Sequence, residues 1–278
     1  MGTDVVLSVK ESTTGHSIVW WVETPNGPAG AWSEDFDGDR LDPAVWLPHY
    51  LPCWSSRAET AAVHHVADSR LTLRVPRDQG LWCAEEHDGP LRLSGIMSGH
   101  HSGPVGSTTG QQQLYAGQRV REQQPEFRGR LLGPGSSVEM RCAMSVSPRS
   151  MAALWLCGWE QVPEQSGEIC VVEIFGNSVR DGGCEVGIGL KTIRDPDLVQ
   201  DFDAPRLPID PADMHTYTAS WDEHEAVFSV DGEVVRRCAG PPTYDLQLMV
   251  AVFDFPDWST GADDDLVPEL VVDWIRTT

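Results

Sequence analysis

The chain has 278 residues, 40% of them hydrophobic, so it is long enough to bury a large core without disulfides or a metal. Its 42 acidic residues outnumber 20 basic ones and give a net charge of -22, which disfavours nucleic acid and other polyanions and favours a neutral partner or substrate. No segment reaches the roughly 18 consecutive apolar residues of a membrane helix, so no contact with a membrane is expected.

Cysteine usage and the first residues bear on the compartment. The seven cysteines are an odd number without CxxC spacing, which favours free thiols and a reducing compartment. The opening MGTDVVLSVKESTTG lacks a basic segment followed by an apolar run, so we expect no signal peptide and favour the cytoplasm, or secretion if the natural protein begins earlier. We expect residues 1–30 to form an N-terminal extension or edge strand and residues 31–278 a single, monomeric domain.

Short segments of alternating apolar and polar residues, separated by glycine and proline, predict β-strands along the chain. Helical periodicity is almost absent. Many short strands with turns between them favour a large β-sandwich. The clearest predicted strands are LTLRV at 71–75, SVEMRCAMSV at 137–146, EAVFSV at 225–230, LQLMVAVF at 246–253 and LVVDWIR at 270–276.

Details of these segments predict which faces are buried. In the segment 137–146, every other residue from Val138 to Val146 is apolar, which predicts one buried face. Asp231-Gly232 follows the segment 225–230 and predicts a hairpin with a tight turn. The segment 246–253 is apolar almost throughout, so we expect both of its faces to be buried. Two long loop-like segments, 98–126 and 194–213, are candidates for functional loops.

The segment SGEICVVEIFG at 166–176 places Glu168 and Glu173 in an otherwise apolar run. Residues five apart on a regular strand point to opposite faces, but one extra residue in a β-bulge returns them to the same face. Two carboxylates so placed would lie roughly 5 Å apart, as retaining glycosidases require. Alternatively, one glutamate faces solvent and the other pairs with an arginine.

Several segments, in the same order along the chain, resemble glycoside hydrolase family 16, whose active-site strand has the pattern E-x-D-x-x-E. The resemblance covers roughly residues 34–276. The matching segments are EDFDGDRLDPAVW at 34–46, SGIMSG at 94–99, SSVEMRCAM at 136–144, MAALWLCGWE at 151–160, SGEICVVEIFG at 166–176, ADMHTYTASWDEHEAVFSVDGEVV at 212–235 and VVDWIR at 271–276.

The resemblance implies a concanavalin A-like β-jelly roll, two curved antiparallel sheets with a substrate cleft along the concave face. It also implies retaining, endo-type hydrolysis of a β-linked glycan, with Glu168 as nucleophile and Glu173 as general acid and base. Because the chain is acidic, we expect a neutral β-glucan with β-1,3 or mixed β-1,3/1,4 linkages. Two alternatives stay open: a glycan-binding jelly roll without catalysis, and a transglycosylase that uses the same two glutamates.

Cys170 stands where the family pattern has its middle aspartate. It lies two residues from Glu168, so the two side chains share a face. A thiol offers only a weak hydrogen bond. Three interpretations follow: Cys170 is a neutral support in an active enzyme, it marks a protein that binds glycan without cleaving it, or it is itself a nucleophile. The third is disfavoured because neighbouring carboxylates raise the pKa of a thiol.

Sugar rings have apolar faces that stack on aromatic planes, and the chain has eleven tryptophans. Trp155 matches a family tryptophan on the cleft floor, and Trp159 follows four residues later. Trp54 lies in the loop-like segment YLPCWSSR, and Lys191 lies in the strand after the glutamate pair. We predict that these four side chains bind substrate, although core packing also explains a single tryptophan.

Metal-binding patterns are weak in this sequence. Neither His64-His65 nor His100-His101 can readily chelate one metal from a strand, and there is no HExxH motif, so we expect no catalytic metal and no required cofactor. The resemblance suggests a structural calcium ion near the termini with Asp273 as a ligand. The run Asp263-Asp264-Asp265 is a second calcium candidate, although a solvated loop explains it equally.

Overall fold

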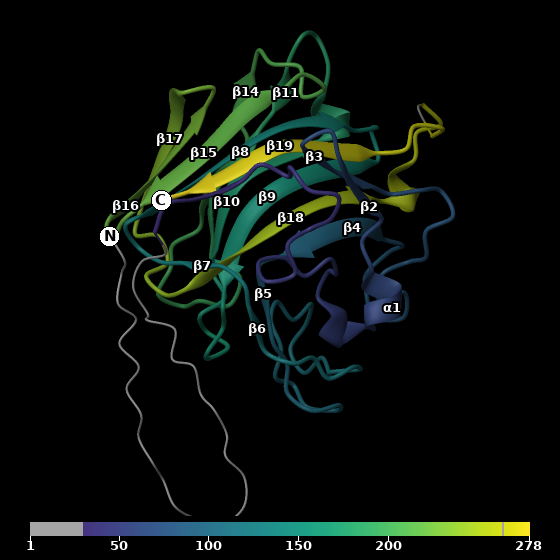
Figure 1. Ribbon diagram of the computed structural model, residues 1–278, viewed down its shortest axis with the longest axis vertical. Helices are drawn as coiled ribbons and strands as arrows, with labels where there is room; N and C mark the ends of the chain where they lie inside the picture. Colours follow the sequence, from purple (N-terminus) through teal and green to yellow (C-terminus); the bar gives the residue numbers. More distant parts are fainter. Residues whose placement is uncertain (1–29, 263) are drawn as a thin grey trace, which may run out of the picture.

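The computed structural model describes residues 30–262 and 264–278, which form two large antiparallel sheets packed face to face (Figure 1). This confirms the fold class that the sequence predicts. The predicted extension or edge strand at 1–30 lies outside the described residues, apart from Gly30.

The first large sheet is called the back sheet here. Its order is β17 (Glu233–Ala239), β16 (Glu225–Val230), β15 (His215–Trp221), β8 (Ser136–Ser145), β19 (Glu269–Thr277), β3 (Arg70–Arg74) and β2 (His64–Ala67), and β1 (Trp32–Glu34) pairs with β19.

The second large sheet is called the cleft sheet here, because the candidate site lies on it. Its order is β13 (Asp201–Asp203), β12 (Gly187–Lys191), β10 (Glu168–Phe175), β9 (Ser150–Gly158), β18 (Leu246–Asp254) and β4 (Arg92–Met97), and β7 (Leu131–Leu132) pairs with β18.

Smaller elements lie outside the two large sheets. They are the strand pairs β11 (Cys184–Glu185) with β14 (Arg206–Leu207) and β5 (Gly99–His100) with β6 (Phe127–Arg128), the helix α1 (Arg57–Thr60), and the 3-10 turns η1 (Pro52–Trp54), η2 (Gly176–Ser178) and η3 (Pro256–Trp258). In the part of the chain that the structure describes, no helix has the length and apolarity needed to span a membrane.

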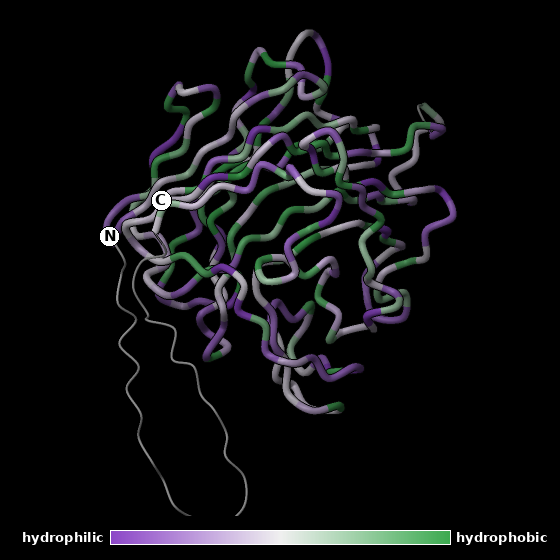
Figure 2. Tube along the Cα trace, viewed as in Figure 1, coloured by the Kyte–Doolittle hydropathy of each residue, from purple (hydrophilic) through white to green (hydrophobic). Residues whose placement is uncertain are grey.

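The main core fills the space between the two sheets, and the sequence pattern shows why. In β8 the alternating apolar residues, such as Met140 and Cys142, are buried and face the cleft sheet, as predicted. The hairpin of β16 and β17 also forms as predicted, because Asp231 and Gly232 both adopt the positive φ that its tight turn requires. Figure 2 shows hydrophobic residues gathered along the central strands.

The cleft sheet is covered on both faces. A second apolar cluster, which includes Trp54, Trp82, Trp155 and Met249, lies on the face opposite the main core, beneath the segments that precede and follow β4. Every residue of β9 and β18 is therefore buried, which confirms the prediction for 246–253. The segments over this face form the walls of the candidate site.

Candidate active site

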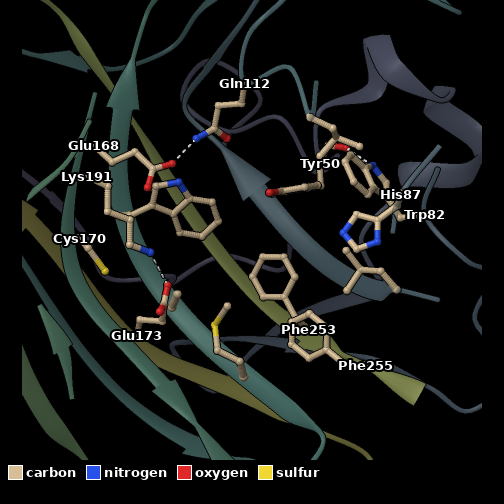
Figure 3. Close-up of a pocket in the computed structure, with 15 residues that line it drawn as sticks. Tyr50, Trp82, His87, Gln112, Glu168, Cys170, Glu173, Lys191, Phe253 and Phe255 are labelled. Atoms are coloured by element: carbon tan, nitrogen blue, oxygen red, sulfur yellow. Dashed lines mark hydrogen bonds and ion pairs between the residues drawn. The ribbon is translucent and has the colours of Figure 1, made fainter. Parts of the chain in front are cut away.

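A β-bulge in β10 brings the two glutamates to one face. Cys170 pairs with Trp155 of β9, but the next pair is Val172 with Leu154, so Val171 is the extra residue. The bulge that the two glutamates need in order to share a face is thus present. As a result Glu168, Cys170 and Glu173 all line one pocket on the cleft sheet (Figure 3). The alternative in which one glutamate faces solvent is excluded.

Glu168 is the more buried carboxylate of the pair, with 8% of its surface exposed. Its Oε1 atom accepts a hydrogen bond from Gln112 Nε2 at 2.5 Å. Burial raises the pKa of Glu168 to about 7, and the Glu173 carboxylate adds to the rise, whereas Lys191 opposes it. Glu168 therefore exchanges its proton near neutral pH.

Glu173 forms an ion pair with Lys191, whose Nζ atom lies 2.9 Å from Glu173 Oε2. Lys191 is also the cross-strand partner of Glu168, and its ammonium lies 4.5 Å from the centre of the Phe202 ring. Burial opposes the charge of Lys191, but the acidic groups beside it, Cys170 and the two glutamates, outweigh this effect and raise its pKa. The Lys191 ammonium thus lies beside both carboxylates. The structure places Lys191 in the pocket, as the sequence predicts.

Cys170 lies between the two glutamates and is almost fully buried. Its Sγ atom donates a weak hydrogen bond to the Gly187 carbonyl oxygen at 3.6 Å. Burial, strengthened by the Glu173 charge, raises the pKa of the Cys170 thiol well above its ordinary value. The thiol is therefore neutral, which disfavours the interpretation that it is a nucleophile. All seven cysteines are free, as predicted.

The pocket encloses a cavity of about 230 Å³ and is mainly aromatic and aliphatic away from the glutamates. Trp155 lies on its floor, as predicted. Figure 3 shows Tyr50, Trp82 and His87 at the end opposite the two glutamates. The remaining lining residues are Leu91, Gln112, Leu114, Met151, Ala153, Phe253 and Phe255.

Trp54 and Trp159 do not line this pocket, contrary to our expectation. Trp54 is 0% exposed and donates its indole N–H to the Gln111 carbonyl oxygen at 2.7 Å. Trp159 is 2% exposed and packs against His101, with ring centroids 4.7 Å apart, and under the guanidinium of Arg128. Both rings support the loop between β5 and β6 rather than the pocket.

Several pocket residues escaped the sequence analysis, above all Gln112, Tyr50, Phe253 and Phe255. Gln112 belongs to the 98–126 segment, whose length marked it as a functional loop, but nothing distinguished this glutamine from its neighbours. Phe253 lies in a strand that is buried throughout, so its pattern does not reveal a cleft-facing role.

The calcium candidates have other partners in the structure. The Asp273 carboxylate accepts a hydrogen bond from Arg141 at 2.6 Å and lies 3.6 Å from Arg70, so two cations already surround it. Asp273 therefore does not fit the suggested calcium ligand. Asp265 pairs with Arg77, and Asp263 lies outside the described residues. Among the described residues, no group of three or more His, Cys, Asp or Glu side chains could hold a metal ion. The absence of a required cofactor stays a prediction.

Two sheets packed face to face, with a carboxylate pair on a bulged strand of the cleft sheet, thus form the candidate site. The chain belongs to glycosyl hydrolases family 16, because the model of that family matches residues 136–276, just over half of the chain. No curated protein matches the sequence.

Solved structures share this fold. The GlcNAcα1-4Gal releasing endo-β-galactosidase from Clostridium perfringens superimposes with a TM-score of 0.72 and 24% identity, covering 92% of this chain and 64% of that one. The chain thus spans less than two thirds of that protein's length.

The laminarinase catalytic domain from Thermotoga petrophila superimposes with a TM-score of 0.62 and 17% identity, covering 88% of this chain and 95% of that one. A lichenase from a mouse hindgut metagenome superimposes with a TM-score of 0.58 and 15% identity, covering 89% of this chain and 98% of that one. At these identities the likeness establishes the fold.

Proposed function

We propose that this protein is a retaining endo-glycoside hydrolase for a neutral β-linked glycan, with Glu168 as nucleophile and Glu173 as general acid and base. The observation that carries the proposal is the bulge at Val171, which turns both carboxylates into one pocket. The aromatic lining supports it, because sugar rings stack on aromatic planes. The neutral Cys170 thiol between the two glutamates fits a supporting role.

The proposed reaction has two steps. The Glu168 carboxylate attacks the anomeric carbon while the Glu173 carboxyl gives its proton to the glycosidic oxygen, so the glycosidic bond breaks and a glycosyl ester forms. Water then attacks the anomeric carbon and gives a proton to the Glu173 carboxylate. The ester bond to Glu168 breaks, and the sugar keeps its β-configuration.

Lys191 limits when each step can occur. Its Nζ atom lies 2.9 Å from Glu173 Oε2, an oxygen of the group that must transfer a proton in both steps. The first step requires a proton on Glu173. We therefore expect the Lys191 ammonium to leave Glu173 when the oxygen of the scissile bond takes its place.

For the substrate we propose a β-1,3-glucan or a mixed β-1,3/1,4-glucan. The net charge of -22 supports a neutral glycan over a sulfated one. A β-galactosidic glycan is the second candidate, because the endo-β-galactosidase superimposes better than the laminarinase, with TM-scores of 0.72 and 0.62.

The test is a reducing-end assay on laminarin, lichenan, curdlan, agarose and β-galactan. Wild-type protein should cleave at least one of them. Glu168→Gln and Glu173→Gln should each lower its kcat by about 1,000-fold or more, because the amide can neither attack nor transfer a proton. Glu233→Gln, on the exposed start of β17, is the matched control.

Three results would change the proposal. Unchanged activity in either pocket variant would contradict the assigned roles. Binding of a glycan without new reducing ends would favour a binding module, and products longer than the substrate would favour a transglycosylase.

A further inference from the structure

The hydrogen bond to Glu168 comes from a loop that lies far from it in the sequence. Gln112, in the connection between β5 and β6, donates its carboxamide N–H to Glu168 Oε1 at 2.5 Å (Figure 3). Position 170 shares the face of Glu168, but the Cys170 thiol points its hydrogen bond at the Gly187 carbonyl oxygen. The carboxamide of Gln112 therefore supplies the hydrogen bond to Glu168 that the side chain at position 170 does not.

The backbone of Gln112 is held in place by a buried ion pair. Glu160 Oε1 accepts the backbone N–H of Gln112 at 2.7 Å, and Glu160 Oε2 accepts a hydrogen bond from Arg194 at 2.5 Å. Arg194 also donates to the Gln113 side chain at 2.6 Å. The Glu160 side chain is only 3% exposed, so breaking this ion pair would leave a buried charge without its partner.

The residue before Gln112 provides a second anchor. The buried Gln111 side chain accepts the His101 backbone N–H at 3.1 Å and donates to the Trp159 carbonyl oxygen at 3.2 Å. Trp54 donates to the backbone oxygen of Gln111. Gln112 itself has a φ of 47°, a left-handed conformation that is uncommon outside glycine and that surrounding contacts must enforce.

We propose that Gln112 is the positioning residue for Glu168: its carboxamide orients the nucleophile and favours its ionised form. This inference rests on the proposed function of Glu168. A carboxamide donates a hydrogen bond without adding charge, so it can favour the carboxylate without the like-charge repulsion of a third acid.

The groups that face Glu168 determine the expected direction of the pH effect. Lys191 on β12 and the Gln112 amide favour the carboxylate form of Glu168. Glu173, which lies with Glu168 on β10, and Glu160 disfavour it. Cys170 beside it, Cys157 paired with it on β9, and Tyr50 across the pocket are neutral because burial raises the pKa of each. Loss of the Gln112 amide removes a favourable contact, so the pKa of Glu168 should rise.

The test compares Gln112→Met with wild type. The variant should lower kcat by about 10- to 100-fold, the effect of losing one hydrogen bond to a charged group, and leave KM within about 2-fold. The acidic limb of the kcat/KM profile should move up by about one pH unit. Gln123→Met, at an exposed site in the same loop, should behave as wild type.

A second variant distinguishes positioning from a merely structural role. Cys170→Asn places an amide donor on the same face, two residues from Glu168. Added to Gln112→Met, it should restore part of the lost kcat and return the acidic limb toward the wild-type pH. Loss of activity without a shift in the pH profile and without rescue would overturn the proposal.

A readout that does not depend on turnover separates this inference from the proposed function. Carbon-13 labelling of glutamate carboxyl groups gives a titration of Glu168, assigned by its loss in Glu168→Gln. The midpoint should be higher in Gln112→Met than in wild type. A raised midpoint in a protein that cleaves no glycan would support the role of Gln112 and reject the proposed hydrolysis; an unchanged midpoint would contradict the role of Gln112.

Discussion

At the scale of single residues, the burial of Glu168 links function to stability. Burial raises its pKa to about 7, so between the ordinary value of 4.5 and 7 the folded protein holds a proton that the unfolded chain has released. This group's contribution to stability is fully present below about pH 4.5 and is lost as the pH rises through 7. Its size is on the order of 3 kcal/mol.

We therefore predict that Glu168→Gln is more stable than wild type at pH 8, because the amide resembles the protonated acid. At pH 4.5 the two proteins should differ much less. Thermal unfolding at both pH values measures this, with Glu233→Gln as the control for loss of an acidic charge. Equal melting temperatures of wild type and Glu168→Gln at pH 8 would show that burial costs the carboxylate little.

Residues of the pocket differ in how far the sequence reveals them. Glu168 and Glu173 could be found because the segment around them resembles the active-site strand of the family, whereas their spacing alone left open whether a bulge brings them to one face. Gln112 could not, because its contact with Glu168 spans 56 residues and a loop glutamine has no distinguishing pattern. Trp54 does not line the pocket because loop-like surroundings do not say which side of a loop a ring faces. Trp159 does not line it either, because β9 ends at Gly158 and the strand alternation from Trp155 does not extend to it.

At the scale of elements, a buried carboxylate ties together three strands of the cleft sheet. Asp254, at the end of β18, forms two hydrogen bonds with Arg149, at 2.6 and 2.8 Å, from the turn before β9. It also lies 3.3 Å from Arg92 of β4. Because Phe253 and Phe255 flank it, this ion-pair cluster holds one end of the pocket in place.

Asp254→Ala should lower the free energy of unfolding by about 3 to 5 kcal/mol, because it leaves the partly buried Arg92 without its partner and Arg149 with only the more exposed Asp264, 3.7 Å away. Urea unfolding measures the loss. Glu225→Ala breaks the exposed ion pair with Arg237 and should cost no more than about 1 kcal/mol. Similar losses in the two variants would mean that the Asp254 cluster contributes no more than a surface pair.

Strands were easier to predict than the segments between them. The alternation of β8 and the Asp-Gly turn of the β16–β17 hairpin are local signals, and both are confirmed. The uniformly apolar β18 was correctly predicted to be buried on both faces. What covers its second face is the loop cluster with Trp54 and Trp82, and long-range packing of loops leaves no periodic signal.

At the scale of the whole molecule, the two sheets have different roles. The back sheet closes the main core, and the cleft sheet carries the glutamates on its other face, under walls built by segments around β4 and the β5–β6 loop. The acidic surface surrounds a pocket in which one lysine offsets two carboxylates. This distribution supports the proposed neutral glycan, because a polyanion would meet repulsion outside and little compensation inside.

The central claim is that two glutamates on one bulged strand hydrolyse a β-linked glycan with retention. The most direct test is proton NMR of the first product formed from whichever glycan wild-type protein cleaves, before the anomers equilibrate. The β-anomer should appear first, and neither anomer should form with Glu168→Gln. The α-anomer as first product would contradict the claim, because it would mean direct attack by water rather than by Glu168.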